Sequence, residues 1–235
     1  MTICKGVIEM GALYKDGVAT VLPTRPWIID LSIIPLYEGI EVGNIADYSQ
    51  CPHWNRWRLG DTPKNSNSRL KWIVLEDKNR RLFICDRVIL MRVSWHDLDS
   101  AGLVFGKKIE IDGTKFNCRL LTGGHDFRIS EDGYSGGKPD RNEWDRFVTG
   151  EQTIKGLLSL KPHNFKGIPN DTVRMSAHNQ LWNYFGAFSW TSTPSSCHKN
   201  ARCARGFKSA KYFYLNTFNH RHEDIGWRPL LEEHF

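Results

Sequence analysis

No apolar run in the 235-residue chain reaches the roughly 18 residues that a membrane-spanning helix needs. The longest candidate, from Trp27 to Leu36, is interrupted by Asp30, Ser32 and Pro35. The N-terminus has no basic region followed by a long apolar stretch, which would mark a secretory signal. These absences predict a cytoplasmic protein without a membrane partner.

Cysteine is sparse, with six in 235 residues, which is too few for a disulfide scaffold. We therefore expect reduced thiols. Cys85 and Cys118 lie among strand-forming residues and are expected to be small buried core side chains.

Several catalytic motifs are missing as well. The sequence contains no phosphate-binding loop, no dinucleotide-binding glycine pattern, no zinc-protease helix and no hydrolase nucleophile elbow. Cys197, Cys203, His220 and His222 could in principle form a zinc site, but their gaps do not match the usual close ligand pairs. The chain is therefore predicted to be non-enzymatic, with no cofactor and no metal.

The first part of the chain is rich in proline, which excludes long helices there. Residues 60–67 have the composition of a loop and look like a boundary. We expect an extended N-terminal segment over residues 1–66 that packs on a domain formed by residues 67–235.

Strand patterns are clearest after residue 70. Residues 70–76 and 82–90 read as two strands, and residues 108–111 and 115–121 form a hairpin around Asp112-Gly113, a dipeptide favoured in tight type I′ turns. Further short strands are expected over residues 187–190, 204–207 and 211–215. The pattern predicts an α+β fold of loop-rich antiparallel sheets.

Two short helices are expected. Asp140 is a candidate N-cap, Glu143 completes the spacing of a capping box, and Gly150 ends the segment. Residues 177–184 could form a further turn or two of helix.

Positive charge is concentrated in one block. Residues 152–222 hold ten Lys and Arg and one Asp, a net charge of +9, which leaves −3 for the rest of a chain whose total is +6. Aromatic residues are interleaved with these cations. The block predicts a binding surface whose candidate residues are Lys199, Arg202, Arg205, Lys208, Lys211, Tyr212, Tyr214 and Arg221.

Three interpretations of the block stay open. Cations and rings suit nucleic acid, where they neutralise phosphates and stack on bases. They suit an acidic protein partner equally well. Alternatively, the aromatics form the core and the cations are solvated strand faces.

Three segments of the C-terminal third form a distinctive pattern: Phe185–Trp190, Arg205–Ala210 and Ile225–Pro229. With this pattern the chain resembles the formylglycine-generating-enzyme, or sulfatase-modifying-factor, superfamily. The resemblance implies a C-type lectin-like fold, with Trp190, Trp227 and Arg228 in the structural core.

From Trp72 onward, the chain also resembles a group of uncharacterised proteins of Firmicutes and their phages. The shared features are Ser94-Trp95, Ile111–Gly113, Cys118–Gly124, Asn142–Asp145 and Gly226–Glu232. Cys197 and Cys203 are reminiscent of the copper-binding cysteine pair of the enzymes, although the spacing is one residue longer.

These observations favour a non-enzymatic binding protein, a phage-type accessory factor that binds a bacterial protein or ribonucleoprotein complex. Inhibition of a host defence complex in the host cytoplasm is one form of this hypothesis. The alternatives are a virion or host-recognition component, a nucleic-acid-binding protein and a copper-dependent oxidase.

Overall fold

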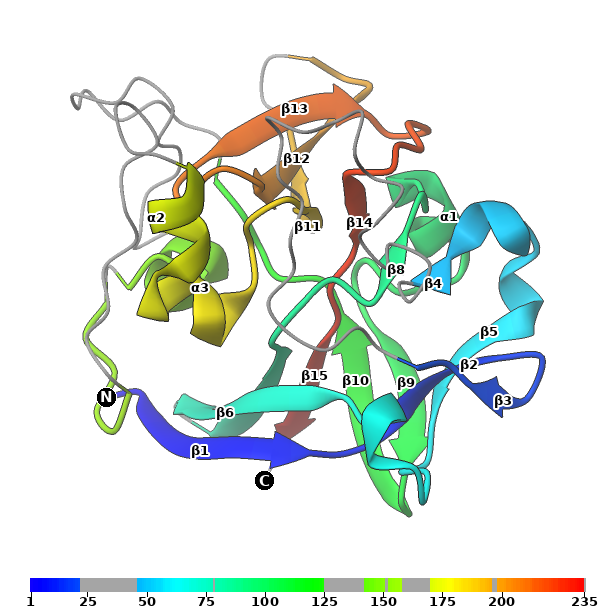
Figure 1. Cartoon of the computed structure of the whole chain (residues 1–235), viewed down its shortest axis with the longest axis horizontal. Coiled ribbons are helices and arrows are strands. Elements are labelled where there is room, and N and C mark those ends of the chain that lie inside the picture. The colour runs from blue at the N-terminus through cyan, green and yellow to red at the C-terminus, as the bar shows by residue number, and fades with distance from the viewer. Residues whose placement is uncertain are drawn as a thin grey trace.

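Two six-stranded sheets dominate the computed structural model, which describes residues 1–21, 46–77, 79–124, 142–150, 152–157, 170–195 and 198–234. In Figure 1 the first sheet lies in the lower half and the second in the upper half. Most strand pairs are antiparallel and the helices are few and short, so the α+β, sheet-rich class is confirmed.

The first sheet has the strand order β1-β6-β7-β15-β10-β9, and every pairing in it is antiparallel. Its strands are β1 (Ile3–Glu9), β6 (Lys71–Asp77), β7 (Arg80–Cys85), β9 (Lys107–Ile111), β10 (Thr114–Arg119) and β15 (Leu230–His234). Both faces carry core: Trp72 and Val74 belong to one hydrophobic cluster, and Ile73 and Leu75 to another. Burial on both faces explains why the sequence of β6 is an apolar run rather than an alternation.

The second sheet has the order β13-β12-β11-β14-β8-β4 and is mixed, because β11 pairs with β14 and β4 with β8 in parallel. Its strands are β4 (Ala46–Asp47), β8 (Leu90–Met91), β11 (Phe188–Pro194), β12 (Ala201–Gly206), β13 (Phe213–Thr217) and β14 (Ile225–Trp227). The two parallel pairs depart from the expected antiparallel arrangement.

The strand expected over residues 82–90 was wrong in its extent. β7 ends at Cys85, and Leu90 begins β8 in the other sheet. Between them the Arg87 guanidinium donates to both carboxylate oxygens of Asp86, at 2.8 and 3.0 Å, in a buried pair. The apolar run from residue 82 to 90 is therefore divided between two strands, and each strand belongs to a different sheet.

The β9–β10 hairpin is confirmed with its turn. Asp112 and Gly113 have φ angles of 50° and 77°, as a type I′ turn requires at both central positions. The Asp112 carboxylate accepts a hydrogen bond from the Thr62 backbone N–H at 2.8 Å.

The N-terminal segment contributes strands to all three sheets, including β4 at the edge of the second six-stranded sheet. β1 is an edge strand of the first six-stranded sheet, next to β6. A small antiparallel sheet is formed by β2 (Ala12–Lys15), β3 (Val18–Ala19) and β5 (Trp57–Gly60). The described residues of this segment and its boundary also form three 3₁₀ turns: η3 (Tyr48–Gln50) and η4 (Trp54–Arg56) lie between β4 and β5, and η5 (Ser66–Ser68) follows β5.

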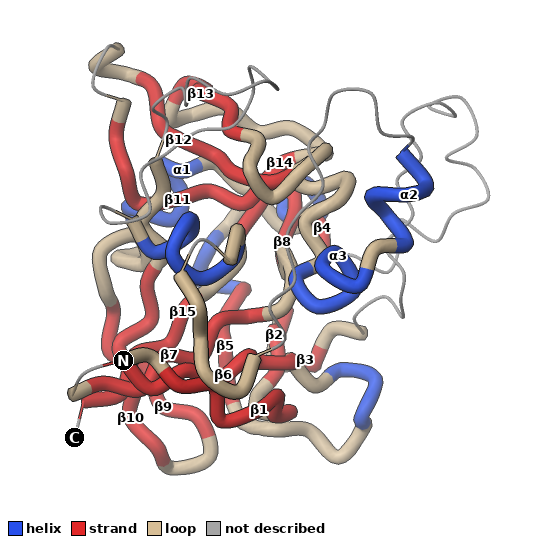
Figure 2. The backbone as a smooth tube through the Cα atoms, turned by 90° about the vertical axis from the view of Figure 1, so that its left-hand side faces the viewer, coloured by secondary structure: helices blue, strands red, loops and turns tan. Residues whose placement is uncertain are grey.

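The helices of the described residues are α1 (Trp95–Ser100), the π-helical turn η6 (Trp144–Val148), α2 (Asn170–Met175) and α3 (Ala177–Trp182). Figure 2 shows α2 and α3 together at one side of the sheets. α3 confirms the helix expected over residues 177–184. The proposed N-cap Asp140 lies outside the described residues, and Glu143 makes no capping box but contacts Arg119 and Thr122.

Candidate binding surface

The core residues implied by the resemblance lie deep in the molecule. Trp190, Trp227 and Arg228 are each about 1% exposed. The Trp190 indole N–H donates to the Val93 carbonyl at 2.9 Å, and the Arg228 guanidinium donates to the Asn183 carbonyl at 3.0 Å.

Arg205 is a correction to the predicted binding surface, because none of its side chain is exposed. Its two terminal nitrogens donate to the two carboxylate oxygens of Asp145, each at 2.9 Å, and one of them also donates to the Gly124 carbonyl at 3.0 Å. A buried guanidinium has lost its hydration, so it needs an opposite charge close by to be stable. Arg205 therefore holds η6 against β12 and is not available to a partner.

Arg202 lies on the opposite face of β12, since side chains alternate along a strand. The centre of its guanidinium is 4.4 Å from the Trp95 ring centroid and 5.8 Å from that of Phe218. One terminal nitrogen donates to the Lys199 and Ala201 carbonyls, at 3.0 Å each. In the described part of the chain, no carboxylate forms an ion pair with Arg202, so its positive charge is uncompensated.

Helix α1 supplies Trp95, the aromatic ring on which Arg202 stacks. Ser94 is the N-cap of the helix. Its hydroxyl accepts a hydrogen bond from the Asp97 backbone N–H, and the Asp97 carboxylate accepts one from the Ser94 backbone N–H, which together form a capping box. Trp95, at the first helical position, is 4% exposed, and its indole N–H donates to the Thr191 carbonyl at 3.0 Å. Trp95 is thus held from two sides, which gives Arg202 a rigid ring to stack on.

Two further aromatic residues, Phe105 and Phe218, lie next to Trp95 and Arg202 and extend the cluster toward the surface. Phe105 meets Trp95 edge to face with 5.9 Å between centroids, and 68% of Phe105 is exposed. Phe218 meets the exposed His96 ring at 5.6 Å. We call the continuous set formed by Trp95, His96, Phe105, Lys199, Arg202 and Phe218 the Arg202 surface.

Sequence reasoning missed the part of this surface contributed by α1 and its following turn, because those residues lie about 50 positions before the start of the basic block at residue 152. The Ser94-x-x-Asp97 spacing was the available signal, since a Ser three residues before an acid marks a helix start. Nothing in the sequence indicated that Phe105 would be left exposed.

Arg221 is exposed but already paired. Its guanidinium donates to both carboxylate oxygens of Asp97, at 2.9 and 2.6 Å, and stacks 5.2 Å from the Tyr48 ring. Burial raises the pKa of Asp97, but hydrogen bonds from Arg221 and Ser94 outweigh it and leave that pKa lowered. Arg221 anchors α1 and adds little net charge to the surface.

The remaining predicted residues lie along the β12–β13 hairpin. Tyr214, 46% exposed, is opposite Ala204 in the register and so shares a face with Arg202. Tyr212 and Tyr214 pack on Phe188 with centroid separations of 5.7 and 5.5 Å. Lys208 and Lys211 are half-buried, whereas Lys199 is exposed.

The cysteines of the described residues are free thiols, and Cys85, Cys118 and Cys203 are fully buried. Burial raises the pKa of Cys203 to about 12, and its Sγ is 3.3 Å from the Gly124 carbonyl oxygen. Metal binding needs the thiolate, so this environment does not favour a copper pair. Cys197 lies outside the described residues, and the His, Cys, Asp and Glu side chains within them include no group of three that could hold a metal ion.

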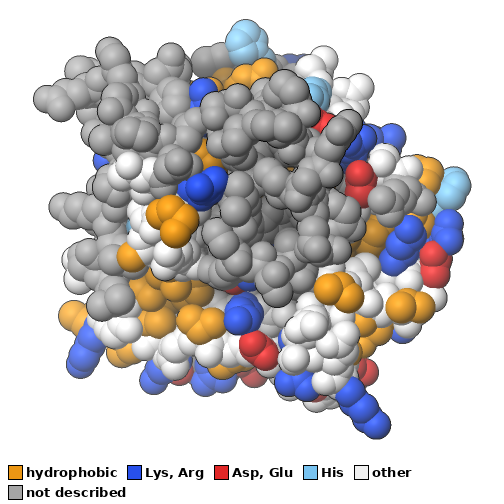
Figure 3. Space-filling model, in the orientation of Figure 1, with side chains coloured by type: hydrophobic (Ala, Val, Ile, Leu, Met, Phe, Trp, Pro, Cys, Tyr) orange, Lys and Arg blue, Asp and Glu red, His pale blue; other side chains and the backbone are white. Residues whose placement is uncertain are grey.

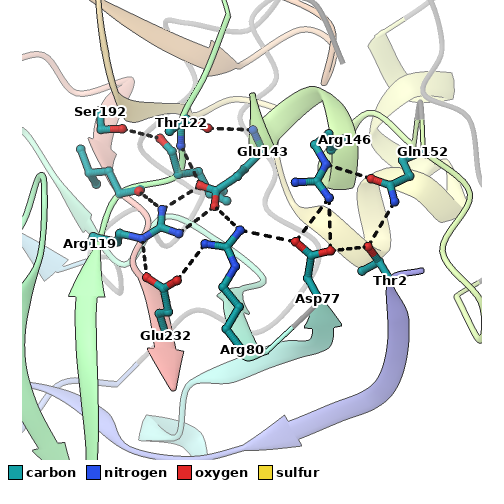
Figure 4. A network of polar contacts seen from close by, with 12 residues as sticks. Thr2, Asp77, Arg80, Arg119, Thr122, Glu143, Arg146, Gln152, Ser192 and Glu232 are labelled. Atoms are coloured by element: carbon teal, nitrogen blue, oxygen red, sulfur yellow. Dashed lines mark hydrogen bonds and ion pairs between the residues drawn. The ribbon is translucent and has the colours of Figure 1, made fainter. Parts of the chain in front are cut away.

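A second cluster of charges is internal to the fold (Figure 4). Arg119 donates to both oxygens of Glu143 at 2.7 Å and to Glu232 at 3.0 Å. Arg80 joins Glu232 at 2.8 Å and also reaches Asp77 and Glu143, at 3.4 Å each. These contacts tie β7, β10 and β15 to the segment before η6. Arg146 also pairs with Asp77, at 3.2 Å, so that three arginines face three carboxylates.

Comparisons with protein-family models, curated protein sequences and solved structures found no match to this chain. No helix of the described residues is long and apolar enough to cross a membrane.

The internal cluster predicts acid sensitivity. Burial raises the pKa of Glu143, but hydrogen bonds and charge from Arg119 outweigh it, so the folded-state pKa is lowered. Its contribution to stability is therefore present above about pH 4 and lost as the pH falls through the folded pKa. Urea unfolding over a pH series should show this decline, with a shallower slope for Glu143→Gln and an unchanged slope for Glu9→Gln. Equal slopes for all three proteins would contradict the assignment.

The buried pair predicts a large loss of stability on neutralising one partner. Asp145→Asn leaves the Arg205 charge buried without its counter-ion, which should cost about 3–5 kcal/mol of unfolding free energy. Chemical denaturation measures this directly. The matched control is Asp16→Asn, which removes an exposed ion pair with Arg56 and should have a much smaller effect. Similar losses in both variants would show that the Arg205 pair does not hold the fold.

Proposed function

We propose that this protein is a non-enzymatic binding protein that recognises an acidic site on a bacterial protein through the Arg202 surface. The observation that carries the proposal is Arg202 itself: a guanidinium that has no carboxylate partner among the described residues and stacks on a buried tryptophan, beside a phenylalanine that is 68% exposed. Arginine and aromatic side chains are the usual energetic anchors of protein interfaces.

The chemistry of the partner follows from these groups. Arg202 and the exposed Lys199 would pair with carboxylates, and the Phe105 ring would pack on an apolar side chain beside them. Because Arg202 already lies on Trp95, little side-chain entropy is lost when a carboxylate binds it. The partner site is therefore an acidic segment that contains an apolar residue.

A protein partner suits this surface better than a nucleic acid does. Stacking on bases needs exposed ring faces, and Trp95 is only 4% exposed because Arg202 covers it. Of the cations that favoured nucleic acid, Arg205 is buried and Arg221 is paired with Asp97. Two of the ten cations in the basic block are thus unavailable to phosphates.

We further propose that the fold is C-type lectin-like and that the protein is a phage-type accessory factor acting in the bacterial cytoplasm. The first rests on the resemblance, together with the burial of Trp190, Trp227 and Arg228. The second rests on the resemblance to proteins of Firmicutes and their phages. Inhibition of a host defence complex is the form of this role that an acidic groove on a host protein would allow.

The binding proposal predicts loss of the partner in a double variant. Phe105→Ala with Arg202→Gln should weaken binding on the order of 10²- to 10³-fold, since each anchor contributes on the order of 2 kcal/mol. Tagged wild-type and variant proteins are compared by affinity purification from a bacterial lysate with quantitative mass spectrometry. The recovered partner is then titrated by calorimetry.

The matched control is Val18→Ala with Arg58→Gln. Val18 is 70% exposed, and the Arg58 guanidinium stacks on Tyr14 in the small sheet, so an exposed apolar side chain and a ring-stacked arginine are removed outside the Arg202 surface. This control should keep full binding. Recovery of no specific partner by the wild type, or equal loss in both double variants, would sink the proposal.

Salt dependence separates a protein partner from a nucleic acid. Few charges lie on the Arg202 surface, so the affinity for the partner should fall only modestly between low and high salt. A nucleic-acid complex would lose on the order of 10³-fold or more over the same range. Fluorescence anisotropy with labelled single-stranded oligonucleotides gives the comparison, and a steep salt response with tight oligonucleotide binding would overturn the choice of partner.

A further inference from the structure

Among the residues that the structure describes, only those around Lys155 pair with the outer edge of β1, and they do so at its start. The Cys4 N–H donates to the Lys155 carbonyl at 2.8 Å, and the Lys155 N–H donates to the Thr2 carbonyl at 3.3 Å. Beyond Cys4, no strand of the described residues pairs with this edge. β1 runs along the lower left border of the molecule in Figure 1.

Apolar side chains are exposed along the open part of this edge. Val7 is 52% exposed and Ile8 is 38% exposed. At the lower left of Figure 3, where β1 lies in Figure 1, hydrophobic side chains reach the surface between basic ones. An edge strand with free backbone groups and apolar side chains is a template for pairing with another strand.

A groove of about 350 Å³ runs beside the edge. Ile8, Val74 and Phe83 form its apolar part, and Lys5, Glu76 and Arg81 form its polar part. Gly6 pairs with Val74 in the register, and a Cβ at Gly6 would meet no atom within 4 Å. The glycine therefore leaves a gap in the apolar wall of the groove.

We propose that a second copy of this chain pairs with β1 as an antiparallel strand across a two-fold axis at Val7. This register sets Val7 against its own counterpart and Ile8 of one copy against Gly6 of the other. An in-register parallel pairing would instead place like charges side by side, which is unfavourable.

The side chains fit this register on both faces of the sheet. Gly6 and Ile8 pair with Val74 and Trp72, so they lie on the groove face. Ile8 of the second copy would then fill the gap at Gly6, twice by symmetry, while the two Val7 side chains meet on the opposite face. Each contact removes apolar surface from water.

The same geometry limits the strength of the dimer. The register of β1 and β6 is irregular between Cys4 and Gly6, and Lys155 occupies the edge before it. Both features shorten the ladder that a second copy can form. The dimer should therefore dissociate on dilution.

Sedimentation velocity over a wide range of protein concentration tests the proposal. The wild type should move from monomer to dimer as the concentration rises. Val7→Lys places like charges directly opposite each other at the two-fold axis and should stay monomeric at concentrations where the wild type is mostly dimeric. Val18→Lys, which puts the same charge on the exposed strand β3, should dimerise as the wild type does.

Cysteine cross-linking tests the register independently. In a Cys4→Ser background, Val7→Cys should form a disulfide-linked dimer under mild oxidation, because the two substituted residues face each other across the strands. Val18→Cys should cross-link much more slowly. A wild type that is monomeric throughout, or a dimer that survives Val7→Lys and cross-links no faster at position 7 than at position 18, would overturn the proposal.

Discussion

Arg205 and Asp145 form an ion pair with neither side chain exposed, and the arrangement of the upper sheet depends on it. The pair joins β12 to η6, two segments sixty residues apart in sequence, beside the Trp144 ring. An isolated charge in such a position would be very costly, so the two segments must come together for either to be buried. Because strand side chains alternate, burying Arg205 on one face of β12 directs Arg202 to the other, toward Trp95 on α1.

This constraint changes how the basic block is understood. One stretch of sequence supplies a buried ion pair at Arg205, a helix anchor at Arg221 and, at Arg202, a cation stacked on a ring with no carboxylate partner among the described residues. Similar cationic side chains therefore serve three different physical purposes, and only the last suits recognition of a partner. Mutual neutralisation is also the rule in the internal cluster around Arg119, which stabilises strand packing instead of presenting charge.

Two surfaces remain available for association, and they differ in kind. The Arg202 surface is built from side chains on α1, the following turn and the β12–β13 hairpin, so it is specific in chemistry. The β1 edge instead offers backbone groups and a small groove, so it would select a partner by how the two strands align. β1 belongs to the lower sheet and the hairpin to the upper sheet, so pairing at the edge uses none of the residues of the Arg202 surface.

Local patterns in the sequence determined local structure. The Asp112-Gly113 turn, the short helix near residue 180 and the burial of Cys85 and Cys118 follow from interactions between near neighbours or from hydrophobicity alone. What the tertiary structure decided was which charges found partners and which strands joined which sheet. Arg205 and Arg202 are indistinguishable in sequence because their partners, Asp145 and Trp95, lie about 60 and 107 positions away, and no short-range signal encodes such contacts.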